Sequence, residues 1–393
     1  MHNEMVANLN IEQSAILNEL ILAVSGETMS SMFFIDAPGG TGKTYLLTCF
    51  LHYLKGHNIN VAPTAYTGIA SLLLEGGRTC HKWFGLPVPV VENSISQVKA
   101  NSAHGHLLRA CKVIIWDEAP MASNLVINCV DSLLQDLHQN NLPFGGKVVV
   151  FSGDFRQVLP VVKHGNRTAI VEQTLKKSRC WHFVKVCHLT ENMRVGEDEF
   201  AHWVLKLSNG ELPSFPRKLA SSVELPSNFI TLDNLVDEIY GVSFDANDVL
   251  QLTKKVILSP LNDHVDKLNQ DVLGKIRGEF FEFELIDEIV PSEYAGPTEF
   301  PTEFLNSLTP SNLPPHVLRL KVGAVIMLMR NLNAESGLVN GMQLQIKEIR
   351  SHCLICTIIT GEHVGNYKII PMIKLTLPED ELPFVFLCKQ FPV

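Results

Sequence analysis

The sequence has no hydrophobic run long enough to cross a membrane, which excludes a chain built around membrane-spanning helices. It is also poor in positive charge, because 32 lysines and arginines stand against 41 acidic residues, a net charge of −9. That balance disfavours a broad basic surface for duplex DNA, although a narrow groove for a single strand is compatible with it. The polar first residues contain no apolar targeting core, so no secretory signal is expected.

Internal repeats, low-complexity tracts and an obvious disulfide framework are also missing. The nine cysteines are scattered, which favours a reducing compartment. Cys353 and Cys356 form a lone CxxC in an apolar, strand-like run without a second ligand pair, so buried strand cysteines are favoured over a zinc or redox site. With 393 residues, 46% of them hydrophobic, the chain is long enough for two or three domains with full cores.

Residues 36–44, DAPGGTGKT, read as a phosphate-binding turn between a predicted strand and a predicted helix. In such a turn backbone N–H groups surround phosphate oxygens, Lys43 reaches the outer phosphates, and the Thr44 hydroxyl ligates Mg²⁺. The pattern has glycine six residues before the lysine, where this chain has Ala37, which is tolerable if its backbone φ is negative. The residues assigned to the nucleotide in this turn are Gly39, Gly40, Thr41, Gly42, Lys43 and Thr44.

A second motif, VIIWDEAP at 113–120, places two carboxylates at the end of an apolar strand. Asp117 is positioned to hold the metal through water, and Glu118 to orient and polarise an attacking water. Either motif alone has a structural alternative, a chance glycine turn or an ordinary acidic strand end. Their occurrence together and in this order predicts a nucleoside triphosphatase.

The first half of the chain alternates strands and helices, which predicts an α/β fold with a parallel sheet covered by helices on both faces. Strands are expected at 32–37, 59–63, 112–117 and 147–152, and helices at 11–24, 43–55, 94–110 and 124–139. Ligands of such sheets bind beyond the carboxyl ends of the strands, where both motifs lie.

In the second half we expect a helix at 196–208, a strand at 255–259 and a helix at 262–275. Six prolines in 291–315 predict a long irregular connection. The segments after it, 317–330, 342–350, 353–360 and 367–377, suggest a small antiparallel β module with a turn at Asn340-Gly341. The final stretch, 384–393, reads as an apolar core strand without a partner, so the chain looks cut short.

Further motifs carry a resemblance to the PIF-type DNA helicases of superfamily 1, the RecD-like branch, and most of all to their plant and Helitron-transposon relatives. The matching segments are LNIEQ at 9–13, APGGTGKT at 37–44, APTAYTGIAS at 62–71, GGRTCHKWFGLP at 76–87, IIWDEAPM at 114–121, FSGDFRQVLPV at 151–161, LTENMRV at 189–195, ILSPLNDHVDKLN at 257–269 and LKVGAVIMLMRNLN…GLVNG at 320–341. The match follows the family's order over nearly the whole chain.

The resemblance assigns further nucleotide roles. It implies that Gln13 recognises adenine through its amide, that Gln157 senses the γ-phosphate and positions water, and that Arg194 is an arginine finger. The residues by themselves leave Gln13 open as a surface glutamine and Arg194 open as a solvated arginine. ATP and Mg²⁺ are the implied cofactors.

The same resemblance implies a single-strand-binding segment at 62–84. Thr64, Thr67 and Gly68 are expected to contact DNA phosphates, and His81 is expected to contact the strand with its ring. The rings of Trp83 and Phe84 could stack on bases, but a place in the core explains them at least as well.

The resemblance also implies a domain plan: a P-loop NTPase with tandem RecA-like domains, the second one incomplete, and a small β-rich insertion. Residues 1–190 are expected to form the first domain, 191–320 part of the second, and 321–393 the insertion and the cut end of the second. The family continues after this point with two DNA-contacting segments that are absent here.

The implied function is ATP-dependent, 5′-to-3′ movement on single-stranded DNA with unwinding of tailed duplexes, in repair, recombination and telomere or genome maintenance. A monomer in the nucleus, without membrane attachment, is expected. The alternative is a truncated, catalytically weak ATP- and DNA-binding remnant of a Helitron-type helicase. A metabolic P-loop kinase does not explain the GDFRQVLP and NMR segments.

Overall fold

The structure is a computed structural model that describes residues 2–162, 165–194, 199–213, 222–244, 251, 253–284, 286–290, 316–333, 336–361, 363–376 and 385–393. By contacts the chain divides into two units, Met1–Val223 and Glu224–Val393, a boundary later than the predicted one at residue 190. Within the described residues, no helix combines the length and the apolar character needed to span a membrane.

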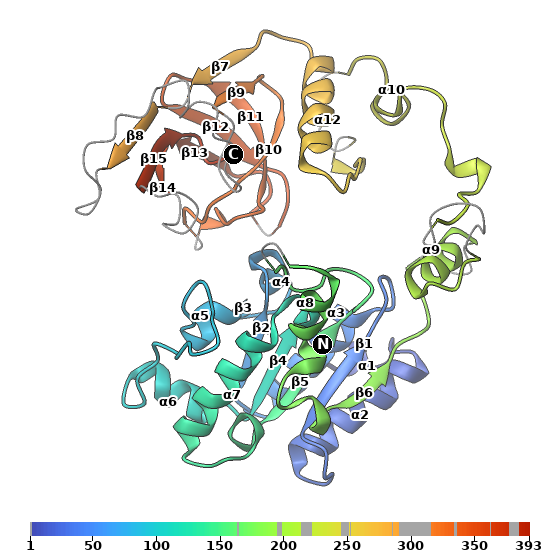
Figure 1. The fold of residues 1–393 in the computed structure, drawn as a ribbon, viewed down its shortest axis with the longest axis vertical. Helices are drawn as coiled ribbons and strands as arrows, with labels where there is room; N and C mark the ends of the chain where they lie inside the picture. Colours follow the sequence, from blue (N-terminus) through green and yellow to red (C-terminus); the bar gives the residue numbers. More distant parts are fainter. Residues whose placement is uncertain are drawn as a thin grey trace. The chain divides into compact units, whose positions relative to one another are not determined.

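The first unit contains a six-stranded parallel sheet with the strand order β3-β2-β4-β5-β1-β6. The strands are β1 Met32–Asp36, β2 Val61–Ala65, β3 Arg78–Thr79, β4 Val113–Asp117, β5 Val148–Gly153 and β6 Lys185–His188. Four of them are the predicted strands, with β2 beginning two residues later than expected. Because β1 lies between β5 and β6, and β4 beside β5, the carboxyl ends that carry the two sequence motifs meet at one edge of the sheet (Figure 1).

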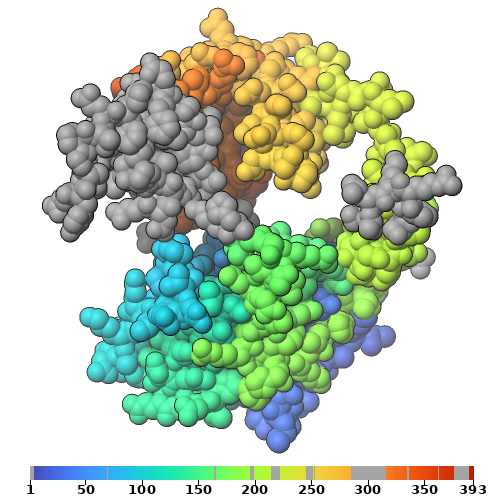
Figure 2. Space-filling view, viewed as in Figure 1, coloured from blue at the N-terminus to red at the C-terminus, as the bar shows by residue number. Residues whose placement is uncertain are grey.

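Helices cover both faces of this sheet, as predicted. The helices described in this unit are α1 His2–Val6, α2 Ile11–Ser25, α3 Lys43–Gly56, α4 Gly68–Leu72, α5 Cys80–Phe84, α6 Ala103–Ala110, α7 Asn124–His138, α8 Arg167–Glu172 and α9 Glu199–Asn209, of which α9 contributes no buried residue. Alternate strand residues enter two separate cores: Phe34 packs with α5 and α7, whereas Phe33 packs with α2 and α3. Helix α8 has no buried residue and forms part of the surface (Figure 2, green).

The predicted helix at 94–110 is correct only at its end, because α6 begins at Ala103. Serine side chains explain the difference, since they bond to the backbone in ways that compete with a helix. Ser94 accepts a hydrogen bond from the Val91 N–H at 2.8 Å, and Ser96 donates to the Phe84 carbonyl at 2.6 Å. Ser102 then caps the first turn of α6.

In the residues that the structure describes, the second unit contains α-helices and three antiparallel sheets. The sheet orders are β10-β11-β12-β13, β14-β15-β8 and β7-β9, around a core that includes Leu344, Leu354 and Phe391. The elements are α10 Leu235–Tyr240, α12 Asn262–Lys275, β7 Phe281–Glu284, β8 Ile286–Val290, β9 Val317–Leu320, β10 Val325–Met327, β11 Gln343–Ile349, β12 Cys353–Ile358, β13 Tyr367–Pro371, β14 Ile373–Thr376 and β15 Val385–Gln390. The antiparallel module and the helix at 262–275 are confirmed, and the proline-rich stretch 291–315 lies outside the described residues.

Two expectations for this unit are wrong. Residues 255–259 form no strand, and the side chains of Val256 and Leu258 are 69% and 86% exposed, so this short apolar run has no sheet to join. The last strand is not unpartnered, because β15 pairs with β14 on one side and with β8 on the other. After it, Phe391 is fully buried, with its ring edge-on to Phe283 at 5.0 Å between centroids.

Candidate nucleotide and DNA site

The phosphate-binding turn runs from the end of β1 to the first turn of α3. Gly40 and Gly42 have φ angles of 91° and 77°, a left-handed conformation that glycine adopts at little cost. A Cβ on Gly40 would lie 2.7 Å from the Asn192 amide oxygen, and one on Gly42 would meet the Gln13 side chain. Ala37 is not among the residues with positive φ, which explains why alanine is accepted there.

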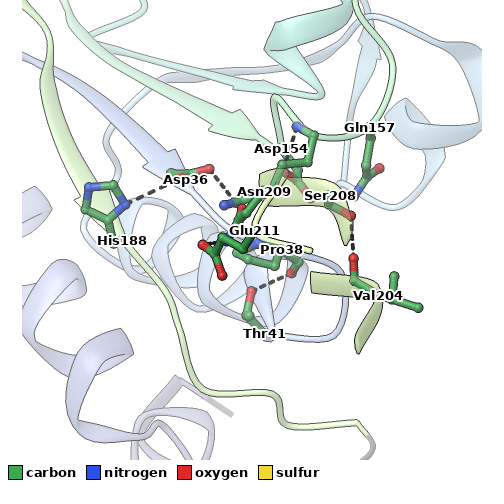
Figure 3. Close-up of polar contacts among 11 residues, drawn as sticks. Asp36, Pro38, Thr41, Asp154, Gln157, His188, Val204, Ser208, Asn209 and Glu211 are labelled. Carbon is green, nitrogen blue, oxygen red and sulfur yellow. Dashed lines mark hydrogen bonds and ion pairs between the residues drawn. The ribbon is translucent and has the colours of Figure 1, made fainter. Parts of the chain in front are cut away.

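Three further predicted residues, Gly39, Thr41 and Thr44, lie in the turn or directly after it. Thr41 is buried and its hydroxyl donates to the Pro38 carbonyl at 2.8 Å, which fixes the shape of the turn (Figure 3). Nothing lies within 4 Å of a Cβ built on Gly39, so space is open beside this glycine. Thr44 lies in the first turn of α3, among the helix N–H groups that favour an anion.

Lys43 lies between the two carboxylates of the second motif. Its Nζ is 2.9 Å from Asp117 Oδ1 and 2.7 Å from Glu118 Oε1. Burial by itself would lower the pKa of Lys43, but the neighbouring charges and hydrogen bonds of Asp117 and Glu118 outweigh burial and raise this pKa. The lysine therefore remains charged, and the three side chains predicted from separate motifs form one ionic cluster.

The two carboxylates are held in different ways. Asp117 is 2% exposed, and its Oδ1 accepts hydrogen bonds from the Ser152 hydroxyl at 2.8 Å and from the Glu118 N–H at 2.9 Å. Glu118 has a φ of 53°, rare for a residue with a side chain, and this left-handed turn directs its carboxylate to Lys43. The sequence did not single out Ser152, although its place at the end of a strand, in FSGD, was a usable signal.

An ionic network ties the loop after β5 to Asp36, which precedes the phosphate turn. Arg156 donates from Nε to Asp154 Oδ1 at 2.6 Å and from Nη2 to Asp36 Oδ1 at 2.9 Å. Gln157 Nε2 donates to Asp154 Oδ2 at 3.2 Å, and His188 Nδ1 lies 3.2 Å from Asp36 Oδ2. Gln157 is exposed and follows β5, at the edge of the sheet where the carboxyl ends of the strands lie and where ligand binding is predicted. Sequence reasoning missed Asp36, Asp154 and Arg156.

Gln13, the residue predicted to recognise adenine, is 2% exposed. Both the oxygen and the nitrogen of its side-chain amide form hydrogen bonds. Its Oε1 accepts from the Asn10 N–H at 3.1 Å, which completes a capping box at the start of α2. Its Nε2 donates to the Thr41 carbonyl at 3.0 Å. Adenine recognition stays a prediction, and it requires Gln13 to exchange at least one of these bonds.

Arg194 lies in a segment that contacts the phosphate turn. The Met193 N–H donates to the Gly40 carbonyl at 2.8 Å, and the Arg194 N–H donates to the Asn192 side chain at 2.9 Å. Arg194 itself is exposed. The predicted arginine finger, Arg194, thus directly follows a residue that is bonded to the phosphate turn of Lys43.

The predicted DNA contacts divide into accessible and buried residues. Thr64 is fully buried in β2 and its hydroxyl donates to the Ala62 carbonyl at 3.3 Å, so this hydroxyl is not available to DNA. Thr67 caps α4 by accepting from the Ala70 N–H at 3.3 Å, and Gly68 follows it at partial exposure. His81 is half-buried, and burial lowers its pKa, so its ring is neutral at pH 7 and suited to stacking.

Trp83 and Phe84 belong to the core. Trp83 Nε1 donates to the Pro63 carbonyl at 2.8 Å, and Phe84 is fully buried and stacked on Trp116 at 5.8 Å between centroids. The alternative of base stacking by these two rings is therefore wrong, because both rings are buried.

Replacement of Phe84 by alanine is expected to cost about 3–5 kcal/mol of stability, the usual loss for a buried aromatic ring. Thermal or denaturant unfolding of the first unit measures this cost. Ile95→Ala, at a side chain 81% exposed, is the matched control and should change little. An unfolding midpoint for Phe84→Ala equal to that of the control would contradict the core assignment.

The two cysteines of the CxxC sequence lie in a β-strand, as predicted. Cys353 and Cys356 lie in β12, and Cys356 is fully buried, which raises the pKa of its thiol to about 12. In the part of the chain that the structure describes, no group of three or more His, Cys, Asp or Glu side chains is arranged to hold a metal.

Comparisons with known proteins agree with this geometry. The sequence profile of the PIF1-like helicase family matches residues 8–218, and that of the Pif1 helicase 2B domain matches 303–349. The ATP-dependent DNA helicase Pif1 of Psychrobacter sp. (strain PRwf-1) is 29% identical over 324 residues, which are 78% of this chain and 43% of that protein. The ATP-dependent DNA helicase PIF1 of Candida albicans is 29% identical over 349 residues, 85% of this chain and 34% of the relative. The chain thus spans less than half the length of these curated relatives.

Among solved structures, Bacteroides Pif1 bound to single-stranded DNA superposes with a TM-score of 0.62 at 21% identity, covering 98% of this chain and 80% of that one. Pif1 helicase from Candida albicans gives a TM-score of 0.60 at 22% identity, with 98% and 83% covered. At these identities the likeness shows the fold alone. The α/β, RecA-like P-loop fold of this chain is that of these helicases.

Proposed function

Because the chain belongs to the PIF1-like helicase family, we propose that it hydrolyses ATP to move 5′ to 3′ along single-stranded DNA and to unwind tailed duplexes. The observation that carries the proposal is the cluster of Lys43, Asp117 and Glu118, which forms where the parallel strands β1 and β4, separated by β5, end at one edge of the sheet. A phosphate-binding lysine, a metal-holding carboxylate and a water-orienting carboxylate are the groups that hydrolysis of a phosphoanhydride requires. Action in repair, recombination and telomere maintenance, in the nucleus, is the biological setting we infer for it.

Binding of ATP starts with an exchange of partners. The N–H groups of the glycine turn and of the first turn of α3 take the phosphate oxygens, and Lys43 leaves the carboxylates to pair with the β- and γ-phosphates. Glu118 is then released to accept a hydrogen bond from the attacking water. The turn fits phosphate because its glycines leave space beside Gly39 and because a charged lysine stands at its end.

The oxygen donors of Thr44 and Asp117 suit Mg²⁺, a hard cation that keeps several waters and needs few protein ligands. Thr44 and Asp117 would hold the ion, which would supply positive charge to offset that of the phosphates. Asp117 is already oriented by Ser152, so one of its oxygens is fixed by the protein. Gln157 would position the attacking water from the loop after β5, and Arg194 would neutralise charge that develops on the γ-phosphate.

DNA contacts are proposed at Thr67, Gly68 and His81, just past the carboxyl end of β2. Thr67 and Gly68 begin α4, where backbone N–H groups favour a phosphate, and His81 offers a ring for a base. His81→Ala should weaken single-strand binding, by roughly 1–3 kcal/mol if the ring stacks on a base. Fluorescence anisotropy with a labelled oligonucleotide measures the loss, and His106→Ala, at an exposed ring on α6, is the control. Equal affinity of both variants would remove His81 from the site.

The proposed function is tested by ATP hydrolysis with and without single-stranded DNA, followed by unwinding of a 5′-tailed duplex. We expect hydrolysis to be stimulated by the single strand and unwinding to require the 5′ tail and ATP. A chain that binds ATP and DNA but shows neither stimulation nor unwinding would instead be the catalytically weak remnant.

A further inference from the structure

We propose that Glu12 is a positioning residue of the ATPase site, which fixes segment 190–193 against the phosphate turn and thereby sets the place of Arg194. The inference rests on the proposed function, because it concerns the arginine that acts on the γ-phosphate. It adds to the nucleotide site a residue that neither the two sequence motifs nor the assigned roles include.

Both carboxylate oxygens of Glu12 accept hydrogen bonds from one short stretch of chain, Thr190 and Glu191. Its Oε2 accepts from the Thr190 N–H at 2.7 Å and from the Glu191 N–H at 3.4 Å, and its Oε1 accepts from the Thr190 hydroxyl. The hydrogen bond from the Thr190 hydroxyl, followed by those from the backbone, lowers the pKa of Glu12. Glu12 is therefore ionised at neutral pH, and its hydrogen bonds are of the stronger, charge-assisted kind.

The segment that Glu12 holds continues directly to the phosphate turn. Asn10 donates to the Glu191 carboxylate at 2.9 Å, which adds a second tie from the start of α2. The Met193 N–H then bonds to the Gly40 carbonyl at 2.8 Å, and Asn192 packs where a side chain on Gly40 would stand. Arg194 is the next residue, one Cα–Cα step of about 3.8 Å beyond this anchor.

This arrangement separates positioning from folding. The strand before the segment is already held by its ladder with β1, by the Leu189 N–H on the Asp36 carbonyl at 2.9 Å, and by Lys185 on Glu19. Loss of the Glu12 bonds leaves those contacts and the phosphate turn itself in place. What is lost is the hold on the backbone of Thr190 and Glu191, four and three residues before Arg194, and a catalytic group displaced by about 1 Å can cost as much as 10²-fold in rate.

Glu12→Gln keeps the shape of the side chain but removes its charge and one acceptor oxygen. We expect kcat for DNA-stimulated ATP hydrolysis to fall by about tenfold while KM for ATP stays within about twofold, because the phosphate turn is intact. Thr190→Val, which removes only the hydroxyl donor from the other side of the contact, should act in the same direction with a smaller effect.

Glu19→Gln is the matched control. Glu19 lies two turns further along the same helix and its carboxylate also reaches β6, through Lys185, but it does not touch 190–193. This variant should keep the kcat of the unaltered chain. A tenfold loss in Glu19→Gln as well would show that general weakening of the α2–β6 contact, and not positioning, is responsible.

The decisive measurement is a double-mutant cycle with Arg194→Ala. If Glu12 acts through Arg194, adding Glu12→Gln to Arg194→Ala should lower kcat no further. The same four proteins are also compared by their affinity for ADP with aluminium fluoride, which mimics the transition state. Their affinity for ADP alone is the reference. We expect both single variants to weaken the mimic and to leave ADP unchanged, without further loss in the double variant.

Additive losses in the cycle, or an unchanged affinity of Glu12→Gln for the mimic, would overturn the inference. The binding measurements also distinguish failure of this inference from failure of the proposed function. A chain without measurable ATP turnover would contradict the proposed function, whereas coupling between Glu12 and Arg194 in binding of the mimic would still decide the role of Glu12.

Discussion

Lys43→Ala is expected to abolish ATP hydrolysis. Lys43 is the only cation of the phosphate turn, so nothing else there can balance the β- and γ-phosphates. The substitution also leaves Asp117 and Glu118 side by side without their common counter-ion, which repels the anionic ligand. Release of phosphate should fall to background with and without single-stranded DNA, and affinity for ATP should fall as well.

Lys55→Ala is the control for this variant. Lys55 lies in the last turn of the same helix, and its ion pair with Glu75 is exposed to solvent, so its loss should change neither stability nor turnover appreciably. DNA-stimulated hydrolysis by Lys43→Ala at the rate of the Lys55→Ala variant would refute the assignment of the phosphate site.

Glu118→Gln is expected to separate binding from chemistry. The amide keeps the size of the side chain but cannot polarise water as a carboxylate does, so turnover should drop by roughly 10²-fold or more. Affinity for ATP should be kept or improved, because the variant removes one carboxylate that competes with phosphate for Lys43. Phosphate release and equilibrium binding of a fluorescent ATP analogue measure the two effects.

Glu75→Gln, at the exposed partner of Lys55, is the matched control and should leave both quantities unchanged. Loss of nucleotide binding in Glu118→Gln would mean that Glu118 has a structural role or is a metal ligand, and the assignment of water orientation would then fall.

The nucleotide site was predictable from the sequence where its chemistry is local. Lys43 and Thr44 follow a glycine turn, and Asp117 and Glu118 follow a buried strand, so spacing along the chain determines their roles. The α/β plan followed from alternation of strands and helices, and parallel strands bring their carboxyl ends together. Ser152 and the Asp36–Arg156 pair were not predicted, because each contact joins residues that local patterns leave unrelated.

The predictions that were wrong also concern properties that depend on residues distant in the sequence. Residues 255–259 have the composition of a strand, but strand formation depends on a neighbouring strand and on burial, and Leu258 is 86% exposed. Thr64 carries the polar group that a DNA contact needs, yet its place inside β2 buries it completely. Trp83 shows the reverse ambiguity, because an aromatic ring suits both a core and a base, and only tertiary packing decides between them.

The Lys43 cluster has a consequence for the timing of the proposed ATPase cycle. Asp117 and Glu118 are tethered to the lysine by the protein itself, so they compete with phosphate at an effective concentration that no diffusing ligand reaches. Part of the attraction between the lysine and a nucleotide is therefore offset by the bonds that must first be broken. In the proposed cycle, the return of the same carboxylates to Lys43 after hydrolysis would displace the product phosphates. This competition would favour rapid turnover over tight retention of nucleotide.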